Sequence, residues 1–233
     1  ECDKLIQSLK KSKRDSIEHV LTHYASSYIP LKENDRTHKQ YEKFKAILRD
    51  LKSGGIKVNE TSCANSGAIE QKFSVENESH IRPGLMMYGA KSHPKSLWSG
   101  KPISDLRAEV LKVESIKKGT PIGYGAHICS DHGYLVYLAL GYGDGILTYY
   151  SGRKIKLYGA ECKILGRVNM DITTVFFKEL PKNFQAGELF NFWGGEVDSE
   201  EYTDVSELAH QLNTSAYQVF TAISSRVPRR YLV

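Results

Sequence analysis

Long apolar runs, closely spaced cysteines and a strong excess of one charge are all missing from this sequence of 233 residues. A membrane-spanning helix needs about 20 consecutive apolar residues, and no such run occurs, so we expect no membrane association. The net charge is only +5, and acidic residues are interspersed with basic ones except around residues 10–14, which argues against nucleic-acid binding. The composition, 40% hydrophobic and 25% charged, is typical of one large or two ordinary globular domains.

The cysteines are few and scattered, at positions 2, 63, 129 and 162. Their spacing matches neither a zinc motif nor a convincing disulfide framework, so we predict no metal site. Unpaired cysteines fit a reducing compartment, and we expect the protein to be cytoplasmic. The chain begins at Glu1, in residues that already show helical spacing, and we therefore expect it to start inside a structural unit.

Helix and strand patterns alternate in the first part of the chain. Apolar residues at helical spacing predict helices, short apolar runs favour strands, and Asn65 or Ser66 is placed to cap a short helix. This alternation implies parallel strands covered by helices. The expected helices are 2–13, 36–52 and 64–73, and the expected strands are 17–24, 56–63 and the stretch from Arg82 to Gly89.

After Gly89 the pattern becomes mostly β, with strand-like runs separated by glycine turns. Two helices are expected near the end, with Asp204 as the N-cap of the first. A loop that follows Gly89 separates this β-rich part from the first part and places the boundary near residues 90–104, which divides the chain into domains of 1–95 and 96–233. The expected strands are 106–113, 134–140, 155–158, 162–168, 172–177 and 188–193, and the expected helices are 204–213 and 216–223.

Residues able to do chemistry gather in glycine-containing stretches. Each has an ordinary explanation when taken alone. Arg82 beside a Pro-Gly turn can be a surface residue, Tyr124 in a glycine loop can be packing, and the Gly-Asp-Gly after Tyr142 can be a hairpin turn. Their order along the chain is more specific than any one of them. The stretches are Arg82-Pro83-Gly84, Tyr124-Gly125-Ala126, Gly141-Tyr142-Gly143-Asp144-Gly145, and Gly166-Arg167 with Met170-Asp171.

Together with Ser66 before a helix and a terminal Arg226-Val227-Pro228-Arg229, this series resembles the alanine racemases, which are pyridoxal-phosphate enzymes. The resemblance covers nearly the whole chain, from Ile17 to the end. It implies the fold class α/β plus mostly-β: a TIM-type β/α barrel followed by a β-rich C-terminal domain. This chain would hold the last three βα units of the barrel and the whole β domain.

The resemblance assigns a cofactor site to the first domain. Ser66 and the backbone of Gly84 and Leu85 would hold the phosphate of pyridoxal 5'-phosphate, which agrees with the physics of anion sites at helix starts and glycine turns. Arg82 would face the pyridine nitrogen, where many pyridoxal enzymes place a carboxylate.

The resemblance assigns catalysis and substrate contacts to the second domain. Tyr124 would be one of two acid/base groups and would handle the α-proton on one face. A phenol with a pKa of about 10 needs cationic neighbours for that task. The Met170 amide, with Asp171 fixing its loop, would lie near the substrate carboxylate. Tyr142 would line the path of the incoming substrate, and Arg167 its outer channel.

Three departures from the family pattern leave details open. The family's second acid/base is a lysine that also forms the Schiff base, in a run like Ala-Val-Val-Lys-Ala-Asn-Ala-Tyr-Gly, and no lysine here lies in such a run. Ser62 stands where many members have a histidine that supports the arginine. Ser225 stands where some have a phosphate-binding tyrosine. The contacts to the ring and the phosphate are therefore open at this point.

The expected function is that of a fragment of an amino-acid racemase that interconverts L- and D-alanine through a pyridoxal-phosphate aldimine. We expect it to be inactive alone because the Schiff-base lysine is absent, and to belong to a homodimer with shared active sites. The alternatives are a serine or broad-specificity racemase, and a non-catalytic racemase-like binding or assembly module.

Overall fold

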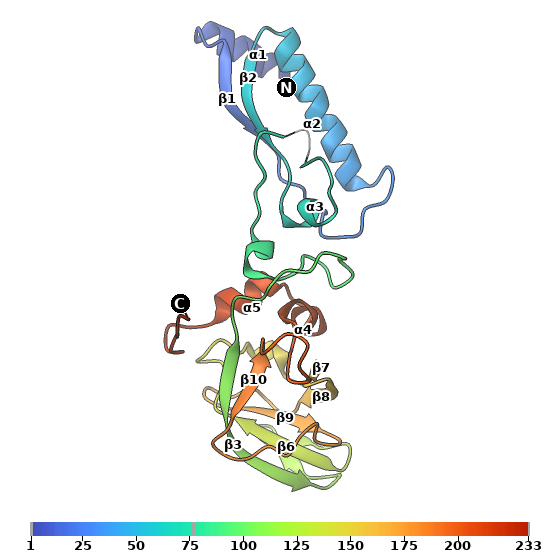
Figure 1. Ribbon diagram of the computed structural model, residues 1–233, viewed down its shortest axis with the longest axis vertical. Coiled ribbons are helices and arrows are strands. Elements are labelled where there is room, and N and C mark those ends of the chain that lie inside the picture. Colours follow the sequence, from blue (N-terminus) through green and yellow to red (C-terminus); the bar gives the residue numbers. More distant parts are fainter. Residues whose placement is uncertain (1, 76–77, 233) are drawn as a thin grey trace. The chain divides into compact units, whose positions relative to one another are not determined.

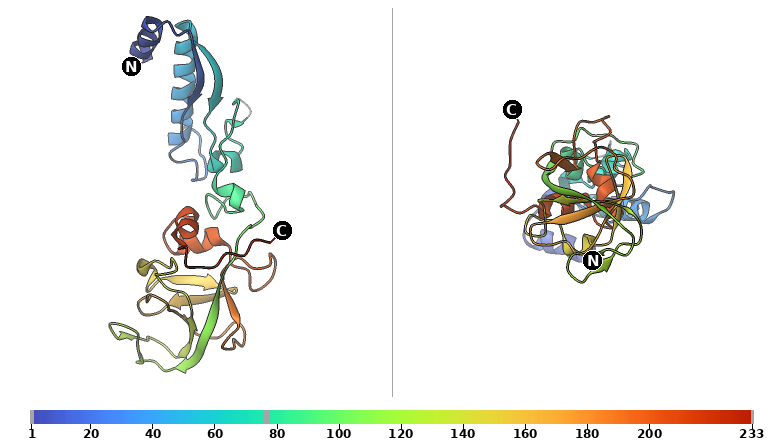
Figure 2. Two further views of the ribbon diagram at one scale, coloured as in Figure 1. Left: turned by 90° about the vertical axis from the view of Figure 1, so that its left-hand side faces the viewer. Right: turned by 90° about the horizontal axis from the view of Figure 1, so that it is seen from below.

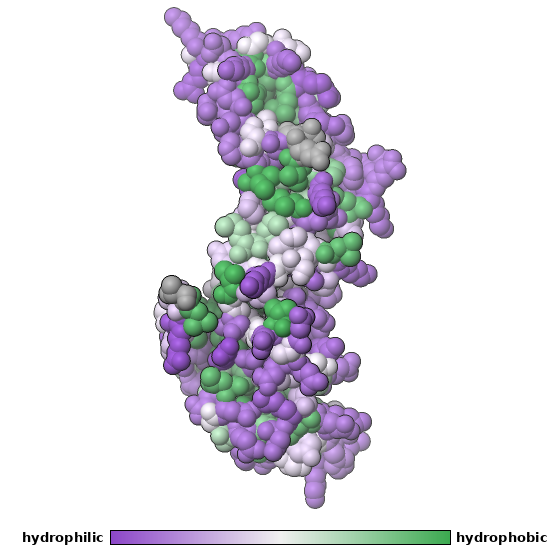
Figure 3. All heavy atoms as spheres, in the orientation of Figure 1, coloured by the Kyte–Doolittle hydropathy of each residue, from purple (hydrophilic) through white to green (hydrophobic). Residues whose placement is uncertain are grey.

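The computed structural model describes residues 2–75 and 78–232. The chain folds as two compact units, Glu1–Lys101 and Pro102–Val233 (Figure 1). None of the described helices is both long enough and apolar enough to cross a membrane. In the face shown in Figure 3, polar side chains predominate and apolar side chains form separate patches.

The first unit is built from helices and a pair of parallel strands. Strands β1 and β2 pair in register from Ser16 opposite Lys57 to Leu21 opposite Ser62. Helix α2 runs alongside the two strands (Figure 1 and Figure 2), and Asp35 caps its first turn by accepting the His38 N–H at 2.9 Å. The elements are α1 (Cys2–Lys11), β1 (Ser16–Leu21), α2 (Arg36–Ser53), β2 (Lys57–Ser62), α3 (Ser66–Glu70) and the 3₁₀ turn η2 (Leu85–Tyr88).

The expected third strand is absent from the described part of this unit. Only a single parallel bridge forms, between Asn65 and Arg82. The reason is local: Pro83 has no N–H to donate to a ladder, and the 3₁₀ turn begins at Leu85. The first unit thus contains two paired strands rather than the three that the alternating pattern predicted.

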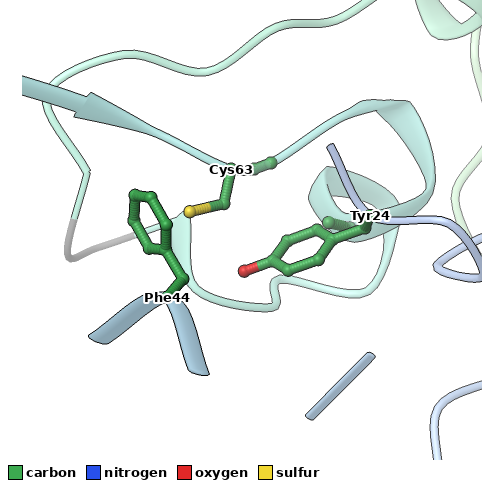
Figure 4. Close-up of a cluster of buried hydrophobic side chains, with 5 residues drawn as sticks. Tyr24, Phe44 and Cys63 are labelled. Carbon is green, nitrogen blue, oxygen red and sulfur yellow. The ribbon is translucent and has the colours of Figure 1, made fainter. Parts of the chain in front are cut away.

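Two apolar clusters hold the first unit together. One joins α1 to α2 and the strands through Ile6, Leu51 and Ile56. The other surrounds Cys63, which is fully buried together with Tyr24 and Phe44 (Figure 4). Burial raises the pKa of the Cys63 thiol to about 12, so this cysteine stays protonated and acts as a packing residue.

The second unit is a six-stranded antiparallel sheet in the order β10-β3-β6-β9-β8-β7. Alternating burial along β9 and β7 buries one face of each strand, as their sequences predict. The elements are β3 (Leu106–Ile116), β4 (Pro121–Ile122), β5 (His127–Ile128), β6 (Gly133–Leu138), η3 (Thr148–Tyr150), β7 (Lys154–Leu157), β8 (Ala160–Ile164), β9 (Thr173–Phe177), β10 (Leu189–Trp193), α4 (Val205–Gln211) and α5 (Ala216–Ala222).

The predicted strands and helices of the second unit are found, with shifted ends. The strand expected over 162–168 ends at Ile164, because Gly166 adopts a left-handed conformation with φ +77° and turns the chain away. The hairpin of β4 and β5 was not predicted, since each of its strands has only two residues. Asp204 caps α4 by accepting the N–H groups of Ser206 and Glu207.

Candidate active site

Arg82 is fixed at the carboxyl ends of the two parallel strands. Its Nη2 donates to the Thr22 carbonyl just after β1 at 2.7 Å, and its Nη1 donates to the Ser62 carbonyl at the end of β2 at 3.0 Å. Among the described residues, no acceptor is bonded to its Nε. The guanidinium is therefore anchored through its two terminal nitrogens, and Nε–H remains able to donate to a ligand.

Ser62 adds a side-chain anchor. Its hydroxyl is fully buried and accepts a hydrogen bond from Arg82 Nη1. On its other side, the same hydroxyl lies 2.9 Å from His19 Nε2 on β1. The sequence left the support of Arg82 open because Ser62 replaces a histidine, and the structure shows that Ser62 contacts the guanidinium directly.

Backbone amides converge on the hydroxyl of Ser66. This oxygen accepts the N–H of Gly84 at 2.9 Å and that of Met86 at 3.4 Å. A Cβ at Gly67 would come 2.5 Å from the Ser27 carbonyl oxygen, so the chain can pass there only as glycine. Amides that already meet at one oxygen form a geometry that suits a phosphate oxygen. The predicted residues Ser66, Gly84 and Leu85 thus lie together with Arg82 in the first unit.

In the second unit, two loops are locked together by their backbones. Tyr142 N–H donates to the Asn169 carbonyl and Gly143 N–H to the Met170 carbonyl, both at 2.9 Å. A Cβ at Gly141 would lie 2.4 Å from the carbonyl oxygens of Asn169 and Met170. Glycine is therefore required for this close approach. The predicted residues Tyr142 and Met170 are brought together, and both side chains are about half exposed.

Arg226 connects the same two loops and was not predicted as a site residue. Its Nε lies 2.9 Å from Asp144, and its Nη2 lies 2.5 Å from Asp171. The hydrogen bond to Asp171 and the charge of Asp144 raise the pKa of the Arg226 guanidinium. The terminal arginine motif marked a resemblance in the sequence, but nothing there indicated that it would pair with carboxylates more than fifty positions away.

Tyr124 stands at the tip of the hairpin between β4 and β5. Its neighbours Gly123, Gly125 and Ala126 all have positive φ, which makes the turn tight and projects the tyrosine outward. The Tyr124 side chain is 71% exposed, so its hydroxyl is accessible and the ring does little packing.

The predicted residue Arg167 lies on a neighbouring turn. A Cβ at Gly166 would meet Ile122 at 3.5 Å, so the turn that carries Arg167 lies against the base of the Tyr124 hairpin. Arg167 itself is exposed. Among the described residues no group of three or more histidine, cysteine or acidic side chains could hold a metal ion.

Two arrangements thus stand out. In the first unit, backbone amides meet at the Ser66 hydroxyl and Arg82 is anchored at the strand ends. The second unit has a tyrosine on a glycine turn and two loops tied together by their backbones and by Arg226. Family models match both units: the alanine racemase N-terminal domain over residues 1–92 and the alanine racemase C-terminal domain over residues 103–231. The chain belongs to the alanine racemase family.

Similar proteins support the same assignment. The alanine racemase of Carboxydothermus hydrogenoformans is 33% identical over 97% of this chain and 61% of that protein. That of Xanthomonas campestris is 34% identical over 80% of this chain and 50% of that protein. The chain thus spans between half and two thirds of the length of these relatives.

Solved structures of alanine racemases are also similar to this chain. Alanine racemase from Bartonella henselae, with covalently bound pyridoxal phosphate, superposes with a TM-score of 0.77 at 25% identity, covering 100% of this chain and 61% of that one. Alanine racemase from Bacillus anthracis with bound L-Ala-P gives 0.74 at 28% identity, covering 100% and 60%.

Proposed function

We propose that this chain is the carboxy-terminal part of a pyridoxal-phosphate-dependent racemase that interconverts L- and D-alanine. The observation that carries this proposal is Arg82, anchored through both terminal nitrogens at the ends of the strands, with the amide cradle at Ser66 in the same unit. The family match and the relatives named alanine racemase support it.

Pyridoxal phosphate, when bound, supplies the electron sink that makes the α-proton of an amino acid acidic. In our proposal Ser66 and the backbone of Gly84 and Leu85 would hold its phosphate, and Arg82 would face its ring nitrogen with Nε–H. Because a guanidinium is always charged, Arg82 would disfavour a protonated ring nitrogen. Arg82 would thereby weaken the electron withdrawal that the ring supplies, which would favour prompt return of the proton to the α-carbon over side reactions.

Tyr124 moves the α-proton on one face of the substrate. The Met170 amide receives the substrate carboxylate, while Asp171, paired with Arg226, fixes the loop that carries Met170. Tyr142 and Arg167 line the path of the substrate. The second acid/base is a lysine, and none of the lysines in this sequence stands in the family's lysine motif. We therefore propose that the 233 residues alone do not racemise alanine.

We further propose the remaining features of the parent enzyme. The parallel pair β1 and β2 with α2 is part of a TIM-type barrel, and the enzyme is a homodimer whose active sites combine the first unit of one subunit with the second unit of the other. The cysteines are free thiols, which suits the reducing cytoplasm that we propose as its location.

The test is a chimera. The amino-terminal part of the Carboxydothermus hydrogenoformans racemase, which supplies the lysine motif, is joined ahead of Glu1, and D- and L-alanine are followed by chiral chromatography with added pyridoxal phosphate. We expect racemisation by the chimera and none by the 233-residue chain. A folded chimera that binds the cofactor without racemising any amino acid would identify a non-catalytic module. Faster turnover of serine than alanine would favour a serine or broad-specificity racemase.

A further inference from the structure

We infer that His19 is a positioning residue for Arg82, that it acts through the hydroxyl of Ser62, and that its neutral form is the one that holds the guanidinium in place. The functional meaning of this relay rests on the role proposed above for Arg82, whereas the relay itself is defined by contacts within the first unit. His19 is a residue of β1 that none of the sequence motifs included.

The strand register places the members of the relay side by side. His19 is paired with Glu60, and Leu21 is paired with Ser62, in the parallel ladder of β1 and β2. Successive pairs of one parity share a face of the sheet, so His19 and Ser62 project to the same side. His19 Nε2 lies 2.9 Å from Ser62 Oγ, and Arg82 Nη1 donates to that same oxygen.

The hydrogens available to these groups fix the favourable protonation state. Arg82 can only donate, so Ser62 Oγ accepts from it and its own single hydrogen must find another acceptor. Neutral His19 with an unprotonated Nε2 is that acceptor, which makes a continuous chain from Arg82 through Ser62 to His19. Once His19 is protonated, Nε2–H would also donate to Oγ. Two cations would then share one oxygen, and the buried serine hydrogen would lose its partner.

His80 and Glu60 lie next to His19. The His80 ring lies 5.7 Å from the His19 ring, and its Nδ1 is 3.6 Å from a carboxylate oxygen of Glu60. His19 is exposed, so solvent can reach its ring. Because only a neutral imidazole can accept the Ser62 hydrogen, the hold on Arg82 is expected to loosen once His19 is protonated.

The experiment measures hydrogen exchange of the Arg82 guanidinium and the tautomer of His19 by nitrogen NMR, on the full 233-residue chain between pH 5 and 8. We expect Nε2 of His19 to be unprotonated at pH 8. We also expect the protection of Arg82, which is its exchange rate compared with the intrinsic rate at the same pH, to decrease as His19 is protonated. His19→Leu should quicken Arg82 exchange roughly fivefold at pH 8, the worth of one net hydrogen bond.

Two variants separate positioning from general stability. His19→Gln keeps an acceptor oxygen near the place of Nε2 but cannot titrate, so Arg82 should stay protected and lose the excess pH dependence. His132→Leu, an exposed histidine of the second unit, should change nothing at Arg82. Protonated Nε2 at pH 8, or identical Arg82 exchange in the wild type and His19→Leu, overturns the inference.

Cofactor binding distinguishes this inference from the proposed function. Pyridoxamine 5'-phosphate, which needs no Schiff-base lysine, is titrated against the chimera and against its Arg82→Leu and His19→Gln variants. Loss of binding only in Arg82→Leu supports the role proposed for Arg82. If the NMR relay is present but pyridoxamine 5'-phosphate does not bind, the relay stands and the proposed cofactor site fails.

Discussion

The proposed proton transfer in the second unit depends on the hydroxyl group of Tyr124. Because the side chain is 71% exposed, the hydroxyl can be removed with little effect on packing. In the chimera, Tyr124→Phe should lower racemisation about a hundredfold to ten-thousandfold, the usual worth of a general acid or base. Its melting temperature should not change.

Tyr134→Phe is the matched control for this variant, since Tyr134 is another partly exposed tyrosine of the same unit, on β6. Full activity is expected from it. A decrease of less than tenfold for Tyr124→Phe in both reaction directions would mean that the Tyr124 hydroxyl is not the acid/base group.

The proposed role of Arg226 depends on the shape of its side chain, because it contacts two carboxylates at once. Lysine carries the same charge but cannot present a planar fork to Asp144 and Asp171 together. Arg226→Lys in the chimera should therefore lower kcat/KM about tenfold or more, as small misplacements of substrate contacts do. Arg230→Lys, at an exposed position nearby, is the control, and equal kcat/KM values for the two variants would exclude the clamp.

Helix α2 depends at its first turn on Asp35. Partial burial opposes ionisation of this carboxyl, but hydrogen bonds from His38, Lys32 and Thr37 prevail and lower its pKa from 3.8 to about 2. A lowered pKa means that folding favours the charged form. The cap thus stabilises the fold fully above about pH 4, and this contribution disappears as the pH falls toward 2.

Replacing Asp35 by alanine should destabilise the first unit by about 1 kcal/mol at neutral pH, the usual worth of an N-cap. Asp35→Asn keeps the acceptor for the His38 N–H without titrating, so it should remove the loss of stability below pH 4 at this site. Urea unfolding followed at pH 7 and pH 3 measures both effects. Equal pH dependence in the wild type and Asp35→Asn would contradict this account.

Elements with a strong local signal were the ones that the sequence predicted. Caps were predicted at Asn65 or Ser66 and at Asp204, because short side-chain acceptors there face exposed amides at helix starts, and the structure shows Asn65 and Asp204 as the caps. The β4–β5 hairpin gave no periodicity to detect, since two residues cannot show alternation. The strand predicted over Arg82 to Gly89 is wrong, because Pro83 cannot donate to a ladder and only the single bridge at Arg82 forms.

The sequence indicated individual site residues but not the contacts that hold them in place. Arg82 and Ser66 were named from the motif series, but the supports of Arg82 at Thr22, Ser62 and His19 come from strands far away in the sequence. A single sequence contains no direct sign of such long-range contacts. The same is true of Arg226, whose partners are set by the packing of loops rather than by any local pattern.

For the whole molecule, the division of the predicted site residues between the two units has a direct test. If active sites are shared across a dimer, a Tyr124→Phe chimera mixed with a chimera lacking the Schiff-base lysine should regain part of the activity, because one site in each heterodimer has both groups. Subunit exchange is verified independently with labelled chains. Exchange without any gain in activity would mean that each site belongs to one subunit.

The first unit also predicts how the chain behaves by itself. A two-stranded parallel sheet has an open edge on each side, and Leu21 and Ile81 are exposed on this unit. We therefore expect the isolated chain to self-associate at micromolar concentrations, as measured by sedimentation velocity. A monomer whose first unit is fully protected in hydrogen exchange would show that the sheet needs no further partner.

The contacts of Arg226 bear on how premature stop codons would act. The described residues 226–232 contribute no strand or helix, so a nonsense mutation at Arg226 would look harmless if only the secondary structure of these residues were considered. It would nevertheless remove the cation shared by Asp144 and Asp171 and leave two loops without their common tie. Such an allele should yield a protein of near-normal abundance with impaired turnover, and a geneticist would score it as a loss of function without a loss of product.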